Sequence, residues 1–166
     1  MDGWIKNIPK AVLHDHLDGG LRVDTLLDLA KKQNYNNLPS TNKIELLNWI
    51  EPKPNKSLAI NLEAWDHTIA VMQDEDSIYR VTMEALEDLS NDGVIYAELR
   101  FAPLMHCQNL LNPTEVVNAV LNGIKDGTNE FGILSGAILC SMRHLNNSKD
   151  CLLYTSPSPR DSTESR

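Results

Sequence analysis

Short apolar segments alternate with longer segments of helical periodicity through the first 150 residues. The segment 10–16 (KAVLHDH) is β-prone and runs into an Asp-Gly-Gly loop, so it is predicted to be a strand. A second strand is predicted over 94–101 (VIYAELRF) and a third over 136–142 (GAILCSM). The chain therefore offers three strands with long connections between them.

Helices are predicted in those connections, because apolar residues recur there at intervals of three and four. The four stripes are Val23, Leu26, Leu27 and Ala30; Leu58, Leu62, Trp65, Ile69 and Met72; Ile78, Val81, Ala85, Leu86 and Leu89; and Val116, Val117, Val120, Leu121 and Ile124. A short helix is predicted over 43–49, and Asn112-Pro113-Thr114-Glu115 is a typical helix start. Strands joined by helical crossovers indicate an α/β fold with a parallel sheet. An open doubly wound sheet and the start of an eight-stranded barrel both fit this order.

The last residues differ in composition from the rest. Residues 151–166 read CLLYTSPSPRDSTESR, and from Thr155 onward no side chain is apolar. Such a segment cannot bury enough surface to offset its conformational entropy, so we expect disorder. It is either a natural flexible tail or translated adapter or vector sequence, and we favour the second origin. We therefore assign residues 1–150 to the folded domain and 151–166 to the tail.

Composition narrows the class of protein. The chain has 15 basic and 23 acidic residues, a net charge of −8, which argues against a nucleic-acid partner. Its longest uncharged apolar stretch, 131–142, is too short to span a bilayer, and the N-terminus lacks the pattern of a signal peptide. Three irregularly spaced cysteines indicate thiols in a reducing compartment. We expect a cytoplasmic protein with no membrane partner.

The candidate chemistry is concentrated at the end of the first strand. If the extended geometry continues, alternation places His14, His16 and Asp18 on one side. Neutral imidazole is a good zinc ligand, and ligands bind at the carboxyl ends of parallel strands. A bare His-x-His also arises by chance, and a catalytic zinc normally has three or four protein ligands. The residues alone leave a metal site and an ordinary pair of histidines both open.

Other polar residues favour structural roles. Plain hydrogen bonding is the expected role of His67, of His106, which can face the mouth of a barrel, and of His144. Glu98 and Arg100 share a face of the second strand and are expected to pair with each other, because charges in an apolar strand need partners.

Three segments resemble the strand signatures of the adenosine deaminase family. Residues 8–20 (IPKAVLHDHLDGG) are similar to that family's opening LPKxELHxHLDGxL. Residues 96–103 (YAELRFAP) and 138–144 (ILCSMRH) resemble its second and third strands. They occur in the family's order and at similar distances, and together they cover nearly all of the first 145 residues. Departures at Val12, Asp15 and Gly20 remove no proposed ligand.

The resemblance implies a fold and a site. The fold would be a TIM (β/α)₈ barrel, of which this chain holds the N-terminal part, about three βα units. One zinc ion per subunit would be held partly by His14 and His16. His16 and Asp18 would contact a small-molecule purine nucleoside, with Asp18 at the ribose 5′-hydroxyl. The helix that carries Leu62 and Trp65 would form a hydrophobic lid beside the pocket.

The implied reaction is hydrolytic deamination of adenosine and 2′-deoxyadenosine to inosine and ammonia in purine salvage, by water activated on the metal. The remaining ligands and the catalytic acid and base would come from later strands, so the chain itself is expected to fold poorly, bind zinc weakly and be inactive. Alternatives are a deaminase of adenine or AMP, another His-x-His metal hydrolase, and a non-catalytic metal- or purine-binding protein. Asp18 favours an uncharged hydroxyl over a phosphate, which a carboxylate repels. The oligomeric state is not assigned.

Overall fold

The computed structural model describes most of the chain. The described residues are 8–51, 58–142, 145 and 148. The predicted tail, residues 151–166, and His144 lie outside them, so the division of the chain at residue 150 stays a prediction.

In the described part of the chain, three parallel strands form one sheet in the order β1-β2-β3. They are β1 (Lys10–His16), β2 (Val94–Phe101) and β3 (Leu134–Leu139), and the first two have the predicted bounds. The bounds predicted for the third strand, 136–142, were wrong at both ends. Its pairing with β2 runs from Tyr96↔Leu134 to Phe101↔Leu139, so β3 ends opposite the last residue of β2. It begins soon after α6, which ends at Phe131.

Among the described residues, five α-helices and two short 3₁₀ helices connect and cover the strands. They are η1 (Leu17–Gly19), α2 (Val23–Lys32), α3 (Lys43–Ile50), α4 (Leu58–Ala70), α5 (Glu75–Asn91), η2 (Pro103–His106) and α6 (Pro113–Phe131). Asn112 caps α6 in a capping box with Glu115, which confirms the predicted start. Met72 does not continue the stripe of α4 as predicted, because that helix ends at Ala70, yet Met72 is fully buried.

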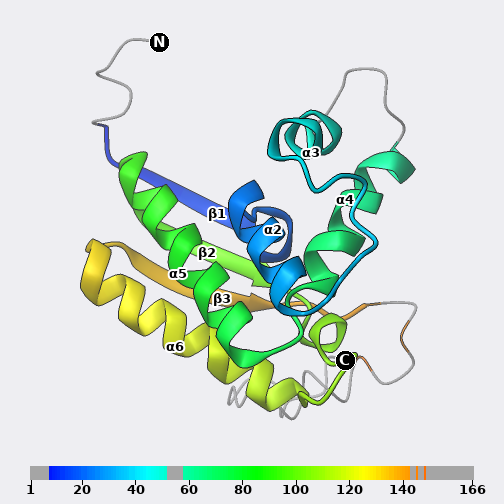
Figure 1. Ribbon diagram of the computed structural model, residues 1–166. Coiled ribbons are helices and arrows are strands. Elements are labelled where there is room, and N and C mark those ends of the chain that lie inside the picture. Colours follow the sequence, from blue (N-terminus) through cyan, green and yellow to red (C-terminus); the bar gives the residue numbers. More distant parts are fainter. Residues whose placement is uncertain (1–7, 52–57, 143–144, 146–147, 149–166) are drawn as a thin grey trace.

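The helices form two groups around the sheet (Figure 1). Helices α5 and α6 lie side by side against one face, while α2, α3 and α4 gather on the side toward which the strands point (Figure 1). Leu86, Leu99, Phe101, Val116 and Val120 are almost completely buried and join α5 and α6 to β2. Burial of this apolar layer is the main term that holds the sheet against the helices. Among the helices of the described part, none is both long and apolar enough to cross a bilayer.

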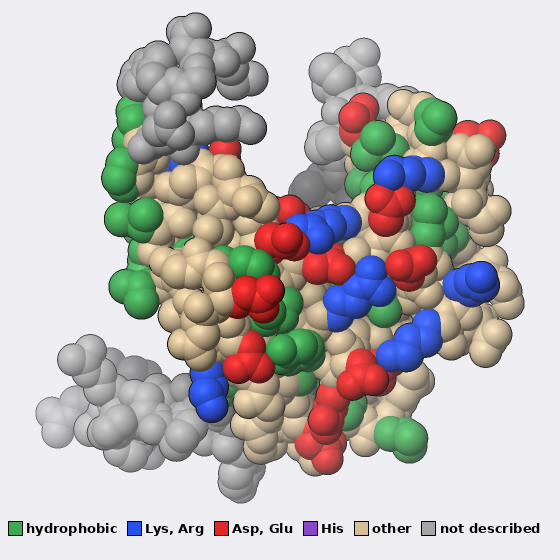
Figure 2. All heavy atoms as spheres, turned by 60° about the vertical axis from the view of Figure 1, so that its left-hand side comes forward, with side chains coloured by type: hydrophobic (Ala, Val, Ile, Leu, Met, Phe, Trp, Pro, Cys, Tyr) green, Lys and Arg blue, Asp and Glu red, His purple; other side chains and the backbone are tan. Residues whose placement is uncertain are grey.

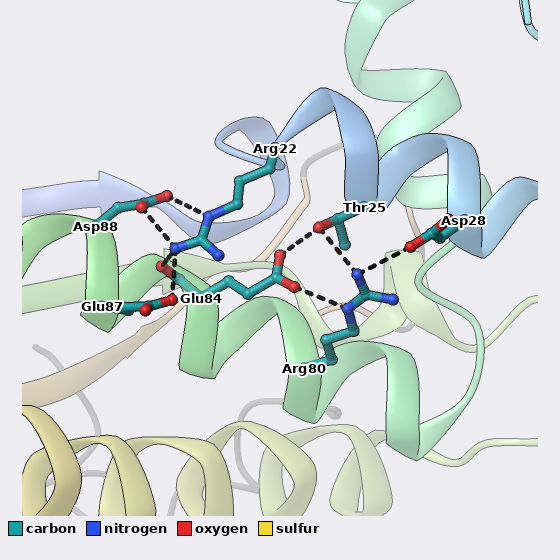
Figure 3. A network of polar contacts seen from close by, with 7 residues as sticks. All are labelled: Arg22, Thr25, Asp28, Arg80, Glu84, Glu87 and Asp88. Atoms are coloured by element: carbon teal, nitrogen blue, oxygen red, sulfur yellow. Dashed lines mark hydrogen bonds and ion pairs between the residues drawn. The ribbon is translucent and has the colours of Figure 1, made fainter. Parts of the chain in front are cut away.

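A polar network joins α2 to α5 (Figure 3). Arg22, which precedes α2, donates from Nη2 to Asp88 at 2.6 Å and to Glu87 at 2.7 Å. Glu84 accepts from the buried Thr25 at 2.5 Å and from Arg80 at 2.8 Å. Figure 2 shows basic and acidic side chains interspersed over the middle and right of one face of the molecule. The network fixes the start of α2 and with it the end of the loop that follows β1.

Two glycines let α5 and α6 approach closely. A Cβ added at Gly123 would lie 2.7 Å from Cβ of Thr82, and one added at Gly127 would lie 2.6 Å from Cδ1 of Leu86. Thr82 cannot move easily, because it is fully buried and its hydroxyl donates to the carbonyl of Ile78 at 2.8 Å. The end of the Leu86 side chain has more freedom. The tight packing of the helix pair therefore depends more on Gly123.

We predict that Gly123→Ala in the full-length protein lowers the free energy of unfolding by about 1–3 kcal/mol, because the clash with Thr82 exceeds the gain in helix propensity. Gly127→Ala should cost less, since Leu86 can change its rotamer. Gly20→Ala is the control, because its added Cβ would meet only the carbonyl of His16, at 3.6 Å. Urea unfolding followed by circular dichroism measures all three variants. Equal stability of the Gly123 variant and the parent would show that the helices can separate without cost.

Candidate functional site

The carboxyl end of β1 departs from regular strand geometry. Val12 pairs with Ala97 and Asp15 with Leu99, so two residues of β1 lie opposite one residue of β2. Within this bulge His14 has φ = 79°, an uncommon conformation for a residue with a side chain. The condition for the predicted alternation, continued extended geometry, is therefore not met. Extended geometry is interrupted at His14 and ends before Asp18, which lies in η1.

The bulge nevertheless brings two imidazoles together. The ring centroids of His14 and His16 are 5.2 Å apart, with 53° between the ring planes. Two imidazoles that share one zinc ion, each with a Zn–N distance of about 2.1 Å, have centroids about 5 Å apart. The pair therefore fits as two of the ligands of one ion. The described residues contain no group of three His, Cys, Asp or Glu side chains placed to hold a metal. Their role as metal ligands stays a prediction.

His16 is held between an aromatic ring and a cation. Trp65 stacks on it, with centroids 4.9 Å apart and 21° between the planes. Nη1 of Arg100 lies 3.1 Å from both ring nitrogens. Burial and then the charge of Arg100 lower the pKa of His16. These influences favour the neutral imidazole, which is the form that binds a metal ion.

The expected pairing of Glu98 with Arg100 was wrong. Arg100 is the direct cross-strand partner of His16, so its guanidinium reaches that imidazole. Glu98 instead accepts a hydrogen bond from the hydroxyl of Tyr96 at 3.2 Å. That two residues share a face of one strand does not predict which residue of the neighbouring strand lies beside them.

Helix α4 packs on the turn that carries Asp18. A Cβ at Gly19 would overlap the indole nitrogen of Trp65, so only glycine allows this approach. The hydroxyl of Thr68 donates to the backbone carbonyl of Asp18 at 2.5 Å. Leu62, on the same helix, is 44% exposed. Trp65 thus forms a wall beside His16, whereas the role of Leu62 and Trp65 as a lid stays a prediction.

The carboxylate of Asp18 lies between two imidazoles. Its Oδ1 is 3.9 Å from Nδ1 of His16, and its Oδ2 is 4.0 Å from Nε2 of His106. His106 is 1% exposed, and its Nδ1 lies 3.1 Å from the carbonyl oxygen of Met72. The expected hydrogen bond of His106 is therefore confirmed. Sequence reasoning missed its approach to Asp18, and the only available signal was its place just after the end of β2.

His67 has the structural role that the sequence predicted. Its Nδ1 lies 2.7 Å from the hydroxyl of Tyr35, and its ring meets Trp49 edge-on at 5.4 Å. It belongs to the packing of α3 and α4 and is not a member of the site.

The arrangement offers nitrogen ligands, a carboxylate acceptor and a flat apolar wall at one edge of the sheet. His14 and His16 can donate lone pairs to a cation, and Asp18 can accept from a ligand hydroxyl. Trp65 gives an aromatic surface that limits access of water to His16. Such a combination suits a metal ion together with a ligand that has both a hydroxyl and a planar ring.

Curated relatives share a large part of this sequence. The chain is 47% identical over 141 residues to the adenosine deaminase of Clostridium acetobutylicum, a match that covers 84% of this chain and 42% of that protein. It is 42% identical over 152 residues to the adenosine deaminase of Mycobacterium avium, covering 88% of this chain and 42% of the relative. The chain thus spans less than half of the length of these relatives.

A solved structure shows the same architecture. The adenine deaminase of Arthrobacter aurescens superposes with a TM-score of 0.76 at 27% identity, over 88% of this chain and 45% of that one. The three-stranded parallel sheet with its helices is an incomplete portion of a TIM barrel, as predicted. The family model for adenosine deaminase matches residues 9–156. The chain belongs to the adenosine deaminase family.

Proposed function

We propose that the protein carrying this chain deaminates adenosine and 2′-deoxyadenosine hydrolytically to inosine and ammonia, as a step of purine salvage in the cytoplasm. The observation that carries the proposal is the convergence of His14, His16 and Asp18 at the carboxyl end of the parallel sheet, within a chain of the adenosine deaminase family. In parallel α/β folds this end is where substrates bind.

One zinc ion per subunit is part of the proposal. His14 and His16 would supply two of its ligands, and the others would come from residues outside the described part of the chain. When bound, zinc lowers the pKa of a coordinated water toward neutrality and so supplies the nucleophile for hydrolysis. Trp65, which stacks on His16, would hold the His16 ring in a fixed plane.

Asp18 would select the nucleoside by accepting a hydrogen bond from its 5′-hydroxyl. The residue is 8% exposed, so a ligand phosphate at the same place would face a charge that little water screens. Adenine has no ribose and would gain nothing from this carboxylate. The position of Asp18 therefore favours adenosine over AMP and adenine among the aminopurines.

We predict that His14→Ala and His16→Ala in the full-length protein each lower kcat for adenosine at least about 100-fold, because each removes a metal ligand. Zinc content after dialysis should fall in parallel. His67→Gln is the matched control, since His67 contacts Tyr35 instead of the site. Ultraviolet absorbance follows the conversion of adenosine to inosine. Retention of the parent rate by either His variant would overturn the proposed metal site.

We predict that Asp18→Ala lowers kcat/KM for adenosine about tenfold and leaves 5′-deoxyadenosine almost unaffected, since only adenosine offers the hydroxyl. Equal losses of kcat/KM for the two substrates would show that Asp18 does not bind the 5′-hydroxyl. Adenine and AMP, assayed in parallel, separate adenosine deaminase from the two related activities.

We predict that the 166-residue chain alone binds zinc at least about 100-fold more weakly than the longer protein and does not turn over adenosine, because two imidazoles are fewer than the three ligands of catalytic zinc sites. Isothermal titration with zinc against a competing chelator measures the affinity. Inosine formation by the purified chain would contradict this prediction.

A further inference from the structure

His106 has one ring nitrogen whose partner is fixed by the fold. Nδ1 lies 3.1 Å from the carbonyl oxygen of Met72, and a carbonyl can only accept, so Nδ1 carries the proton. Burial lowers the pKa of His106, which favours the neutral ring. In that state Nε2 has a lone pair and no proton. The hydrogen bond to Met72 therefore sets the tautomer that His106 presents to Asp18.

Nε2 of His106 is a buried acceptor that faces another acceptor. It has no hydrogen-bond partner among the described residues, and Oδ2 of Asp18 lies 4.0 Å away. That distance is too long for a direct hydrogen bond. It is the separation that one water spans when it donates to both atoms at about 2.8 Å, with an angle near 90°.

We propose that His106 is a positioning residue, which holds the Asp18 carboxylate through one bridging water in the orientation that receives the ribose 5′-hydroxyl. The inference rests on the proposed function. Thr68 donates to the backbone carbonyl of Asp18, so this bond does not fix the side-chain torsions of Asp18. The two flanking imidazoles are the groups placed to restrict them, and His16 lies at the opposite oxygen.

A purely structural role does not account for this histidine. The bond to Met72 uses only Nδ1, and burial of an Nε2 without a hydrogen-bond partner is unfavourable. An apolar residue could fill the same space without that cost. The orientation of Nε2 toward Asp18 is therefore the feature of His106 that its packing does not explain.

Two variants of His106 distinguish the role of Nδ1 from that of Nε2. In His106→Asn the amide replaces Nδ1 and can still donate to Met72, but nothing reaches toward Asp18. In His106→Gln the amide replaces Nε2 and can still contact the bridging water. We expect His106→Asn in the full-length protein to lower kcat/KM for adenosine about tenfold, with 5′-deoxyadenosine changed less than about twofold. We expect His106→Gln to restore most of the adenosine rate. His67→Asn serves as the control for loss of a histidine that lies away from Asp18.

The outcomes are distinct. If His106→Asn lowers kcat/KM equally for adenosine and 5′-deoxyadenosine, or does not lower it for adenosine, the inference is overturned and the proposed function stays in place. A parent protein without deaminase activity would overturn both. If His106→Asn does not fold, the ¹⁵N shifts of the parent imidazole decide: a protonated Nδ1 and bare Nε2 support the inference, and a protonated Nε2 overturns it.

Discussion

Parallel pairing on both sides of β2 is the constraint on which the rest of the structure depends. It sets His16 opposite Arg100 and Phe101 opposite Leu139, so the carboxyl ends of all three strands meet at one edge. Segments that leave this edge, η1 after β1 and η2 after β2, are then neighbours although they are far apart in sequence. The approach of Asp18 to His106 follows from this pairing.

The site itself is built from departures from regular geometry. His14 has a positive φ inside a bulge, and Gly19 lies in a turn that Trp65 covers without space for a side chain. Such conformations persist only where the surroundings determine them. Here regular pairing resumes at Asp15, and α4 holds the turn through Trp65 and Thr68. The sheet and α4 thus stabilise a local geometry that the segment would not adopt alone.

The sequence predicted those features that depend on neighbouring residues along the chain, such as the bounds of the first two strands. The first two strands were predicted with their exact bounds because each is apolar and ends at a turn signal, Asp-Gly-Gly or a proline. The bounds of the third strand were displaced because its C-terminal end is set by the end of β2, which is a contact between distant segments. The predicted Glu98–Arg100 pairing was wrong because Arg100 contacts His16 on the neighbouring strand. Neither the bulge at His14 nor the lone pair of His106 has a signature in the sequence. Resemblance to the family indicated His14, His16 and Asp18, but the irregular geometry that brings them together became visible only in the structure.

Under the proposed function, the tasks of the enzyme are divided along the chain. The described residues supply two metal ligands, an aromatic wall and the carboxylate that binds the ribose hydroxyl, whereas they place no third metal-binding side chain together with the two histidines. Selectivity for a substrate with a free 5′-hydroxyl can then be set by residues that take no part in proton transfer. A phosphate in place of the hydroxyl would lie against a buried carboxylate, and its repulsion would grow as the remaining barrel excluded water. Recognition of nucleotides within this architecture therefore requires a change at Asp18 or at the imidazoles that flank it.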